Sequence, residues 1–258
     1  MKFTVVIPAR YGAVRLPGKP LRQIAGRPMI EHVYRRAAES GADEVIVATD
    51  DERIRKAAEA VGARVCMTDS AIPSGTDRIA AVVRGLGYPD DRIIINLQGD
   101  EPQMPAVLID QVAEDMALHP DAAIATLCVP ITDLAEVFDP GIVKVVMNAE
   151  GYALYFSRAP MPWLREGFAT EPKTLPGEVS HYRHVGLYAY RAGFLREYAA
   201  WPPSPLERWE FLEQLRALWH GCRIHVALAR ARPPVGVDTE RDLERVSKEM
   251  ATDSGPPL

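Results

Sequence analysis

The feature that most restricts the fold of this chain is a regular alternation of short apolar runs and helical segments over residues 1–121. Phe3 to Pro8 and Glu44 to Thr49 are nearly continuous β-branched and apolar runs, typical of strands covered on both faces of a parallel sheet. Apolar residues at helical spacing follow the first run at 29–40, and Asp51 is placed to cap a second helix. The pattern predicts an α/β fold with a doubly wound, mostly parallel sheet, which binds its ligands beyond the carboxyl ends of the strands.

The pattern changes after residue 121. Four segments alternate like half-exposed antiparallel strands, and a turn at 148–151 joins two of them as a hairpin; the segments are 124–129, 143–147, 152–156 and 184–190. Helices are expected at 206–219 and 239–250, with a strand at 224–228 between them. We therefore expect a first part at 1–121, a smaller antiparallel part at 122–250 packed on the same core, and a disordered tail at 251–258.

Composition excludes several classes of protein. The net charge is −5, so there is no overall positive field to hold nucleic acid, and a small anionic ligand must be bound by a local group of Arg and Lys side chains. Three distant cysteines, Cys66, Cys128 and Cys222, without Cys-x-x-Cys spacing, argue against a disulfide framework and against a zinc site. No apolar run reaches membrane-spanning length, and the N-terminal one is too short for a signal peptide. We expect a cytoplasmic protein that binds neither nucleic acid nor membrane.

The loop after the first predicted strand carries Arg10, Arg15 and Lys19 among glycines and prolines. Cationic side chains and open backbone amides are what a triphosphate requires when no Walker loop is present. Lys19, between Gly18 and Pro20, is the foremost candidate for a phosphate contact. A solvated basic loop would have the same composition.

Two acidic residues are candidate metal ligands: one follows a predicted strand and the other precedes a predicted helix. Asp100 comes after the most hydrophobic predicted strand, and its side chain is expected to face the ligand crevice. Asp238 stands one residue before Thr239, the expected cap of the last helix, so its carboxylate can face the crevice. Magnesium is typically held by one or two carboxylates together with phosphates and water. The alternatives are a turn acid at 100 and a helix-end acid at 238.

Ser74 precedes another predicted helix, with Asp77 three residues further on. This is the spacing of a capping box whose acid is one methylene short, so a purely structural role competes with ligand binding.

These segments resemble known motifs. The string Ile-Pro-Ala-Arg-Tyr-x-x-x-Arg-Leu-Pro-Gly-Lys-Pro-Leu at 7–21 resembles the opening signature of the 3-deoxy-manno-octulosonate cytidylyltransferases, or CMP-Kdo synthetases. Ser-Gly-Thr-Asp-Arg at 74–78 and Gly-Val-Asp-Thr at 236–239 resemble later blocks of that family in the same order, so the resemblance extends from residue 3 to about residue 250. The chain departs from the family at Ala13 and Val14, where relatives usually carry two hydroxyl side chains.

The resemblance implies an enzyme of lipopolysaccharide precursor synthesis. Such an enzyme has a nucleotide-diphospho-sugar transferase fold, its smaller part binds the sugar, and it forms a homodimer. The anomeric hydroxyl of Kdo attacks the α-phosphorus of CTP, pyrophosphate leaves, and CMP-Kdo forms with the help of Mg²⁺. Two alternatives stay open: another ulosonic acid such as 8-amino-Kdo is the substrate, or the chain binds CTP without turning it over.

The resemblance also implies roles for individual residues. Lys19, Asp100 and Asp238 would be catalytic, the two acids as metal ligands. The nucleotide would contact Pro8, Ala9, Arg10, Arg15, Lys19, Ser74, Arg78 and Gln98. The sugar would contact Gln98, Arg158, His184, Tyr188, Glu207 and Gln214, with Arg158 as the partner of its carboxylate.

Overall fold

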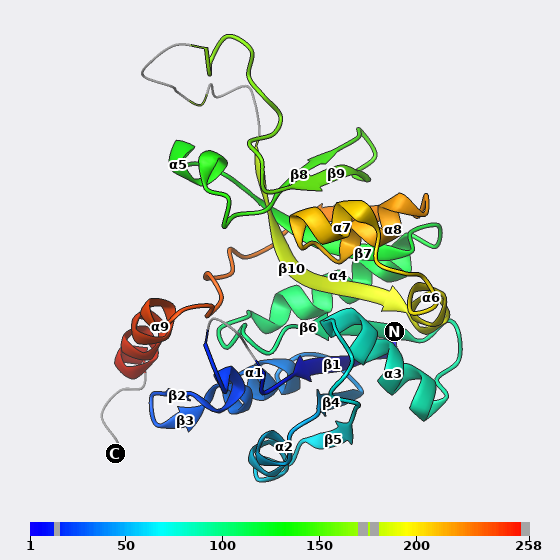
Figure 1. Cartoon of the computed structure of the whole chain (residues 1–258), viewed down its shortest axis with the longest axis vertical. Helices are drawn as coiled ribbons and strands as arrows, with labels where there is room; N and C mark the ends of the chain where they lie inside the picture. The colour runs from blue at the N-terminus through cyan, green and yellow to red at the C-terminus, as the bar shows by residue number, and fades with distance from the viewer. Residues whose placement is uncertain (13–15, 170–174, 176–180, 254–258) are drawn as a thin grey trace.

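The N-terminal apolar run forms β1 (Phe3–Ala9), and all seven of its residues are buried inside the main sheet. The computed structural model describes residues 1–12, 16–169, 175 and 181–253 (Figure 1). Within these residues the main sheet has nine strands in the order β11-β7-β10-β6-β1-β4-β5, with the β8–β9 hairpin attached to β10. The remaining strands of this sheet are β4 (Glu44–Thr49), β5 (Arg64–Met67), β6 (Ile93–Leu97), β7 (Ile124–Pro130), β8 (Lys144–Met147), β9 (Ala153–Ser157), β10 (Tyr182–Arg191) and β11 (Ile224–Leu228).

Four of the eight strand pairings described in this sheet are parallel, and the run β6-β1-β4-β5 is entirely parallel, which confirms the predicted α/β fold class. Strand β1 pairs in parallel with β4 and β6, β4 with β5, and β7 with β11. Strand β10 lies between β6 and β7 and runs antiparallel to both. The sheet therefore continues across the boundary predicted at residue 121. A separate two-stranded sheet is formed by β2 (Gln23–Ile24) and β3 (Arg27–Pro28).

Helices cover both faces of the sheet because alternate strand residues point to opposite sides. Val5 and Ile7 of β1 belong to one apolar core, whereas Val6 belongs to the other. The first core includes side chains of α1 (Met29–Ala38), α2 (Glu52–Glu59), α4 (Ala106–Leu118) and α9 (Glu240–Asp253). The second includes side chains of α3 (Gly75–Leu86), α6 (Ala192–Tyr198) and α8 (Gln214–Trp219). The short helices η1 (Lys19–Leu21), α5 (Leu134–Phe138) and α7 (Pro205–Glu210) complete the described elements.

Three expectations are wrong in detail. Strand β7 is not half-exposed, because it lies inside the sheet and sends Leu127 to one core and Cys128 to the other. The helix expected at 206–219 is divided into α7 and α8, because Phe211 has a positive φ of 54° and ends α7. Helix α9 continues to Asp253, so residues 251–253 are helical rather than part of a disordered tail, and residues 254–258 lie outside the described part of the chain.

Among the described residues, no helix combines the length and the apolar character that crossing a membrane requires.

Candidate active site

A cavity of about 320 Å³ lies beyond the carboxyl ends of β1 and β6, as the strand pattern predicts. Its lining comes from five stretches of chain that lie far apart in the sequence. The lining residues are Pro8, Ala9, Arg10, Leu16, Lys19, Pro20, Pro73, Ser74, Gly75, Arg78, Gln98, Gly99, Asp100, Glu213 and Asp238. Nine of these lining residues, Gln98 among them, were expected from the sequence to contact nucleotide, metal or sugar. Arg15, like Ala13 and Val14, lies outside the described residues.

Two glycines allow the segments around the cavity to approach closely. A Cβ atom at Gly99 would lie 2.8 Å from the carbonyl oxygen of Pro8, so only glycine lets the ends of β1 and β6 come together. A Cβ atom at Gly236 would lie 2.8 Å from Oε1 of Glu101. Beside it, the backbone amide of Val237 donates to the carbonyl of Asp100 at 2.9 Å. This contact places the segment that carries Asp238 against Asp100.

The ammonium of Lys19 lies between the two acids. Its Nζ donates to Oδ2 of Asp100 at 2.8 Å and to Oδ1 of Asp238 at 3.0 Å, and it also reaches the carbonyl of Val237. Burial opposes the charged form of Lys19, but Asp100 and Asp238 outweigh that effect and raise its pKa. Lys19 therefore stays protonated and holds two carboxylates that would otherwise repel each other.

The donor set at this point fits a hard divalent cation such as Mg²⁺. Asp100 and Asp238 converge on one ammonium, and their side chains keep 33% and 47% of their exposure, so both can reach an incoming ligand. Carboxylate oxygens are the donors that Mg²⁺ prefers. Glu101 is different, since burial and the charge of Asp100 raise its pKa to about 8. At neutral pH Glu101 keeps its proton and is a poorer metal ligand.

The start of α3 forms another wall of the cavity. Ser74 caps this helix as the sequence suggested: its Oγ accepts from the amide of Asp77 at 3.0 Å. Asp77 is too short to complete the box through the backbone, and its Oδ2 instead accepts from the Ser74 hydroxyl at 2.7 Å. Glu213 accepts from the amides of Gly75 and Thr76 at 3.3 and 2.9 Å. A carboxylate of the chain itself thus occupies the anion-binding end of α3.

Arg78 lines the cavity, but its guanidinium is held within the fold. The side chain is 2% exposed, its Nη2 donates to Oδ2 of Asp50 at 3.2 Å, and its Nη1 donates to the hydroxyl of Thr68. Arg78 thereby joins the carboxyl end of β4 to the cavity wall.

Of the six residues expected to contact the sugar, Gln98 alone is among those that line the cavity. A polar group is formed by three others, His184 and Tyr188 on β10 and Gln214 at the start of α8. The hydroxyl of Tyr188 donates to Gln214 at 3.2 Å, and its ring lies 5.3 Å from the ring of His184. Tyr188 is the register partner of Asn96 on β6, whose Oδ1 accepts from Gln98 at 3.0 Å.

This polar group has spare donors. The buried amide nitrogens Nδ2 of Asn96 and Nε2 of Gln214 have no hydrogen-bond partner in the described part of the chain. Buried polar atoms without partners are rare in proteins, so these two nitrogens are available to a polar ligand that extends from the cavity past Gln98.

Glu207 and Arg158 lie apart from the cavity lining. Glu207 completes a capping box with Ser204 and makes two hydrogen bonds to the buried guanidinium of Arg216, at 2.8 and 2.6 Å. Arg158 donates to the backbone carbonyls of Glu210 and Pro140 at 2.8 and 2.9 Å. No carboxylate of the described residues is paired with the Arg158 guanidinium.

Glu213 is the polar residue of the cavity that the sequence analysis missed. It stands directly before Gln214, inside a stretch whose apolar spacing predicts a continuous core helix. The sequence signal for Glu213 is its position next to Gln214, a predicted sugar contact.

Comparison with known proteins agrees with this arrangement. The sequence profile of the cytidylyltransferase family matches residues 4–224. The 3-deoxy-manno-octulosonate cytidylyltransferase of Nitrosococcus oceani is 59% identical over 253 residues, which cover 98% of each chain. The enzyme of the same name from Coxiella burnetii is 56% identical over 246 residues, covering 95% of this chain and 98% of its own.

Solved structures show the same fold. The structure of a CMP:2-keto-3-deoxy-manno-octonic acid synthetase complexed with CTP has a TM-score of 0.88 and 43% identity, and the match covers 98% of this chain and 100% of that chain. A 4-diphosphocytidyl-2C-methyl-D-erythritol synthase, at 15% identity, has a TM-score of 0.63 over 96% of this chain and 98% of its own, which shows the fold alone. From the profile match and the near full-length identity to curated relatives, the chain belongs to the cytidylyltransferase family, among the 3-deoxy-manno-octulosonate cytidylyltransferases.

Proposed function

We propose that this protein transfers CMP from CTP to Kdo, releasing pyrophosphate and forming CMP-Kdo for lipopolysaccharide synthesis. The observation that carries the proposal is the position of Lys19 between Asp100 and Asp238 at the mouth of a cavity, where cationic and acidic groups meet beyond the strand ends. The relatives whose names specify this reaction match almost the whole chain.

Arg10 and Lys19 are the cations that would contact the phosphates of CTP. Arg10 is an exposed residue of the cavity lining whose Nη1 donates to the carbonyl of Pro73 at 3.4 Å, a long contact that it can exchange for a triphosphate. Lys19 can exchange its carboxylate partners for phosphate oxygens. Both cations neutralise the charge that develops on the departing pyrophosphate as the anomeric hydroxyl attacks the α-phosphorus.

Asp100 and Asp238 would hold Mg²⁺ once CTP is bound. The ion supplies positive charge to the phosphates and to the attacking hydroxyl. The same two carboxylates bind the Lys19 ammonium, which keeps them side by side.

We infer that the polar group of His184, Tyr188 and Gln214 positions the sugar. A Kdo molecule that extends from Gln98 toward Tyr188 and Gln214 would meet the unpartnered amide nitrogens of that group. Arg158 carries a guanidinium that no described carboxylate neutralises, so it suits the carboxylate of an ulosonic acid. We assign Glu207 to the fold, because its carboxylate is already bound by Arg216.

We also propose a homodimer in the cytoplasm. Three large side chains around α7 and α8 are strongly exposed, namely Trp209, Phe211 and Trp219 at 75%, 82% and 54%. Such a group is typical of a surface that a second copy covers. Sedimentation of the parent and of Phe211→Ser at equal concentration tests this, and an unchanged monomer mass for the parent would exclude the dimer. The cytoplasm is where CTP is made.

The reaction is tested by measuring pyrophosphate release from CTP and Mg²⁺ with Kdo, 8-amino-Kdo or N-acetylneuraminate supplied separately. Release with Kdo alone supports the proposal, and release with another acid keeps the reaction but changes the sugar. Binding of CTP with no release from any of the three would favour a CTP-binding protein without catalysis.

Asp100→Asn is the blank for this assay and should lose most of the turnover while keeping the fold. Asp91→Asn is the matched control, because Asp91 is an exposed acid just before β6, at the end of that strand opposite to Asp100. It should release pyrophosphate at the parental rate.

A further inference from the structure

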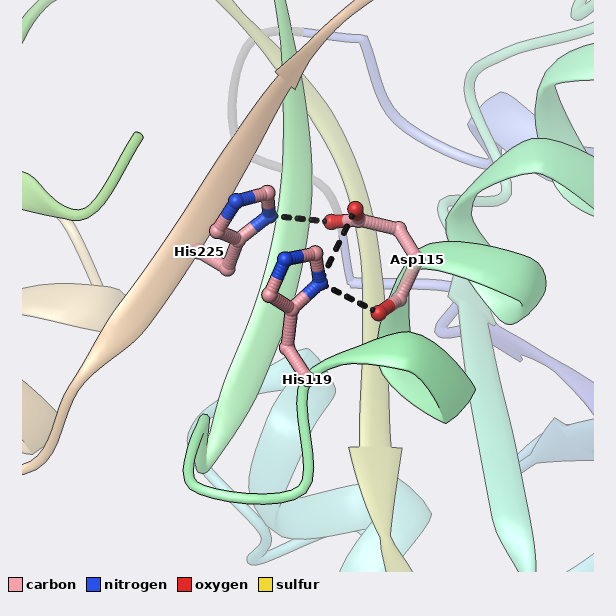
Figure 2. A group of neighbouring side chains, drawn as sticks. All are labelled: Asp115, His119 and His225. Carbon is pink, nitrogen blue, oxygen red and sulfur yellow. Dashed lines mark hydrogen bonds and ion pairs between the residues drawn. The ribbon is translucent and has the colours of Figure 1, made fainter. Parts of the chain in front are cut away.

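Asp115, His119 and His225 form a compact cluster away from the cavity (Figure 2). Nδ1 of His225 lies 2.7 Å from Oδ2 of Asp115, and Nδ1 of His119 lies 3.3 Å from Oδ1 of the same carboxylate. The two imidazole rings are stacked, with centroids 3.5 Å apart and an angle of 16° between their planes. Figure 2 shows Nδ1 of each ring facing Asp115, and Nδ1 of His119 also lies 2.9 Å from the backbone carbonyl oxygen of Asp115.

The carboxylate of this cluster has only histidine side chains as ion-pair partners among the described residues. Asp115 and His225 are each 8% exposed, and neither Arg nor Lys is paired with Asp115 in the described part of the chain. A buried carboxylate is costly unless a positive charge compensates it. His119 keeps 29% of its side-chain exposure, which leaves a path from solvent to the donor atoms.

We propose that Asp115, His119 and His225 bind a divalent transition metal of the Zn²⁺ class, separate from the magnesium of the reaction. Two imidazole nitrogens and one carboxylate oxygen are a common donor set for zinc, with the fourth position left to water. The three donor atoms lie within 4.8 Å of one another. Tetrahedral zinc, with bonds of about 2.0–2.2 Å, separates its ligands by about 3.3–3.5 Å. For the ion to enter, the two stacked rings must turn relative to each other, and each Nδ1 must give up the proton of its present hydrogen bond.

The surroundings already orient the two rings. Tyr152 packs edge-on against both imidazoles, with centroids 6.2 and 5.2 Å away, and its hydroxyl donates to Asp121 at 2.7 Å. The backbone of Gly151 closes over the other side of His225, since a Cβ atom there would lie 2.9 Å from Nε2.

The position in the fold separates this site from catalysis. His225 lies near the start of β11, the edge strand, and Asp115 and His119 lie at the end of α4. Strands β6, β7 and β11 run in the same direction, so the cluster lies at the amino ends of the strands, opposite to the cavity. A bound ion would fasten the edge strand to α4 without touching the nucleotide.

The test titrates ZnCl₂ alone into the full-length, chelator-treated protein and follows binding by calorimetry and by thermal unfolding. The matched variants are His119→Gln and His225→Gln, and the control is His220→Gln, because His220 is exposed and stacks on Trp201 instead. We expect one zinc ion whose affinity falls by at least about 100-fold in either ligand variant and is unchanged in the control. Zinc at about 100 times its dissociation constant should raise Tm by roughly 5–10 °C in the parent.

Coordination is checked with Co²⁺, whose visible absorption reports a four-coordinate nitrogen and oxygen site and should disappear in His119→Gln. His119 is partly exposed, so this variant is expected to fold even if His225→Gln does not. Pyrophosphate release should be the same in His119→Gln as in the parent. Absence of binding, or zinc binding of equal strength in His119→Gln and the parent, overturns the proposal.

Discussion

The carboxylate of Asp238 accepts a hydrogen bond from the ammonium of Lys19 at 3.0 Å, across a separation of 219 residues in the sequence. The same ammonium holds Asp100 at 2.8 Å, so one cation joins the first, the middle and the last segments of the site.

Replacing Lys19 by Met should therefore have two effects. Pyrophosphate release should fall by at least about 100-fold, because a cation at the phosphates is lost. The two acids should also repel each other, so Mg²⁺ should raise Tm more in the variant than in the parent. Lys56→Met, an exposed lysine of α2, is the control. Normal release by Lys19→Met would remove this residue from the proposed chemistry.

Gly236→Ala tests whether the close approach of two segments is needed for activity. The added methyl group would lie 2.8 Å from Glu101 and 3.1 Å from the carbonyl of Asp100, which pushes Asp238 away without removing any functional group. A displacement of about 1 Å can reduce turnover by about 100-fold. Gly85→Ala is the matched control, since nothing lies within 4 Å of its added Cβ and alanine favours the helix. Equal rates for the two variants would show that the approach is not required.

His184 should make the protein less stable in mild acid. Its ring contacts Phe156, Tyr188 and the hydroxyl of Thr126, none of them acidic, and burial lowers its pKa to about 3. An unfolded histidine has a pKa of about 6.5, so between these values the unfolded chain binds the extra proton and stability falls as pH decreases.

Between pH 7 and pH 5 this histidine alone should cost about 2 kcal/mol of unfolding free energy. Urea titrations of the parent and of His184→Gln at both pH values measure the effect. The variant should lose correspondingly less stability on acidification, while the exposed His220→Gln should behave as the parent does. Parallel losses in all three proteins would mean that His184 is protonated in the folded state.

Arg216 and Glu207 should act on stability rather than on sugar binding. Arg216 is 2% exposed and pairs with Glu207 at 2.6 Å and with Asp77 at 3.1 Å. Arg216→Met leaves buried acids without a partner and should cost about 3–5 kcal/mol in urea unfolding. Adding Glu207→Met to that variant should restore part of the loss, as expected for coupled neighbours. If Glu207→Gln instead raises KM for Kdo and leaves unfolding unchanged, Glu207 is a sugar contact.

Local patterns predicted the elements of this fold better than their arrangement. Strands β1 and β4 are recognisable because their apolar runs are continuous, and the caps at Asp51 and Ser74 are recognisable because capping depends on neighbouring residues. The place of β10 between β6 and β7 depends on pairing across more than 50 residues, which no local period records. The break at Phe211 escaped prediction for a related reason, since the apolar spacing continues through it.

In the candidate active site, too, local patterns identified residues but not their long-range partners. Asp100 could be selected because it follows a predicted strand, Asp238 because it precedes a predicted helix cap, and Lys19 because it is a cation in the glycine- and proline-rich loop after the first strand. Arg78 and Glu207 were selected through the family resemblance, and the structure gives each an internal partner, Asp50 and Arg216. The cluster of Asp115 with His225 was not foreseen because 110 residues separate the two.

Strand β10 lies between two strands that precede it in the sequence, so the main sheet cannot form in full until β10 has been synthesised. Until residues 182–191 have been synthesised, β6 and β7 each present an unpaired edge. Such edges are templates for pairing with other chains. The strands can therefore join into one sheet only after this strand is available, and β7 keeps its other edge open until β11 pairs with it.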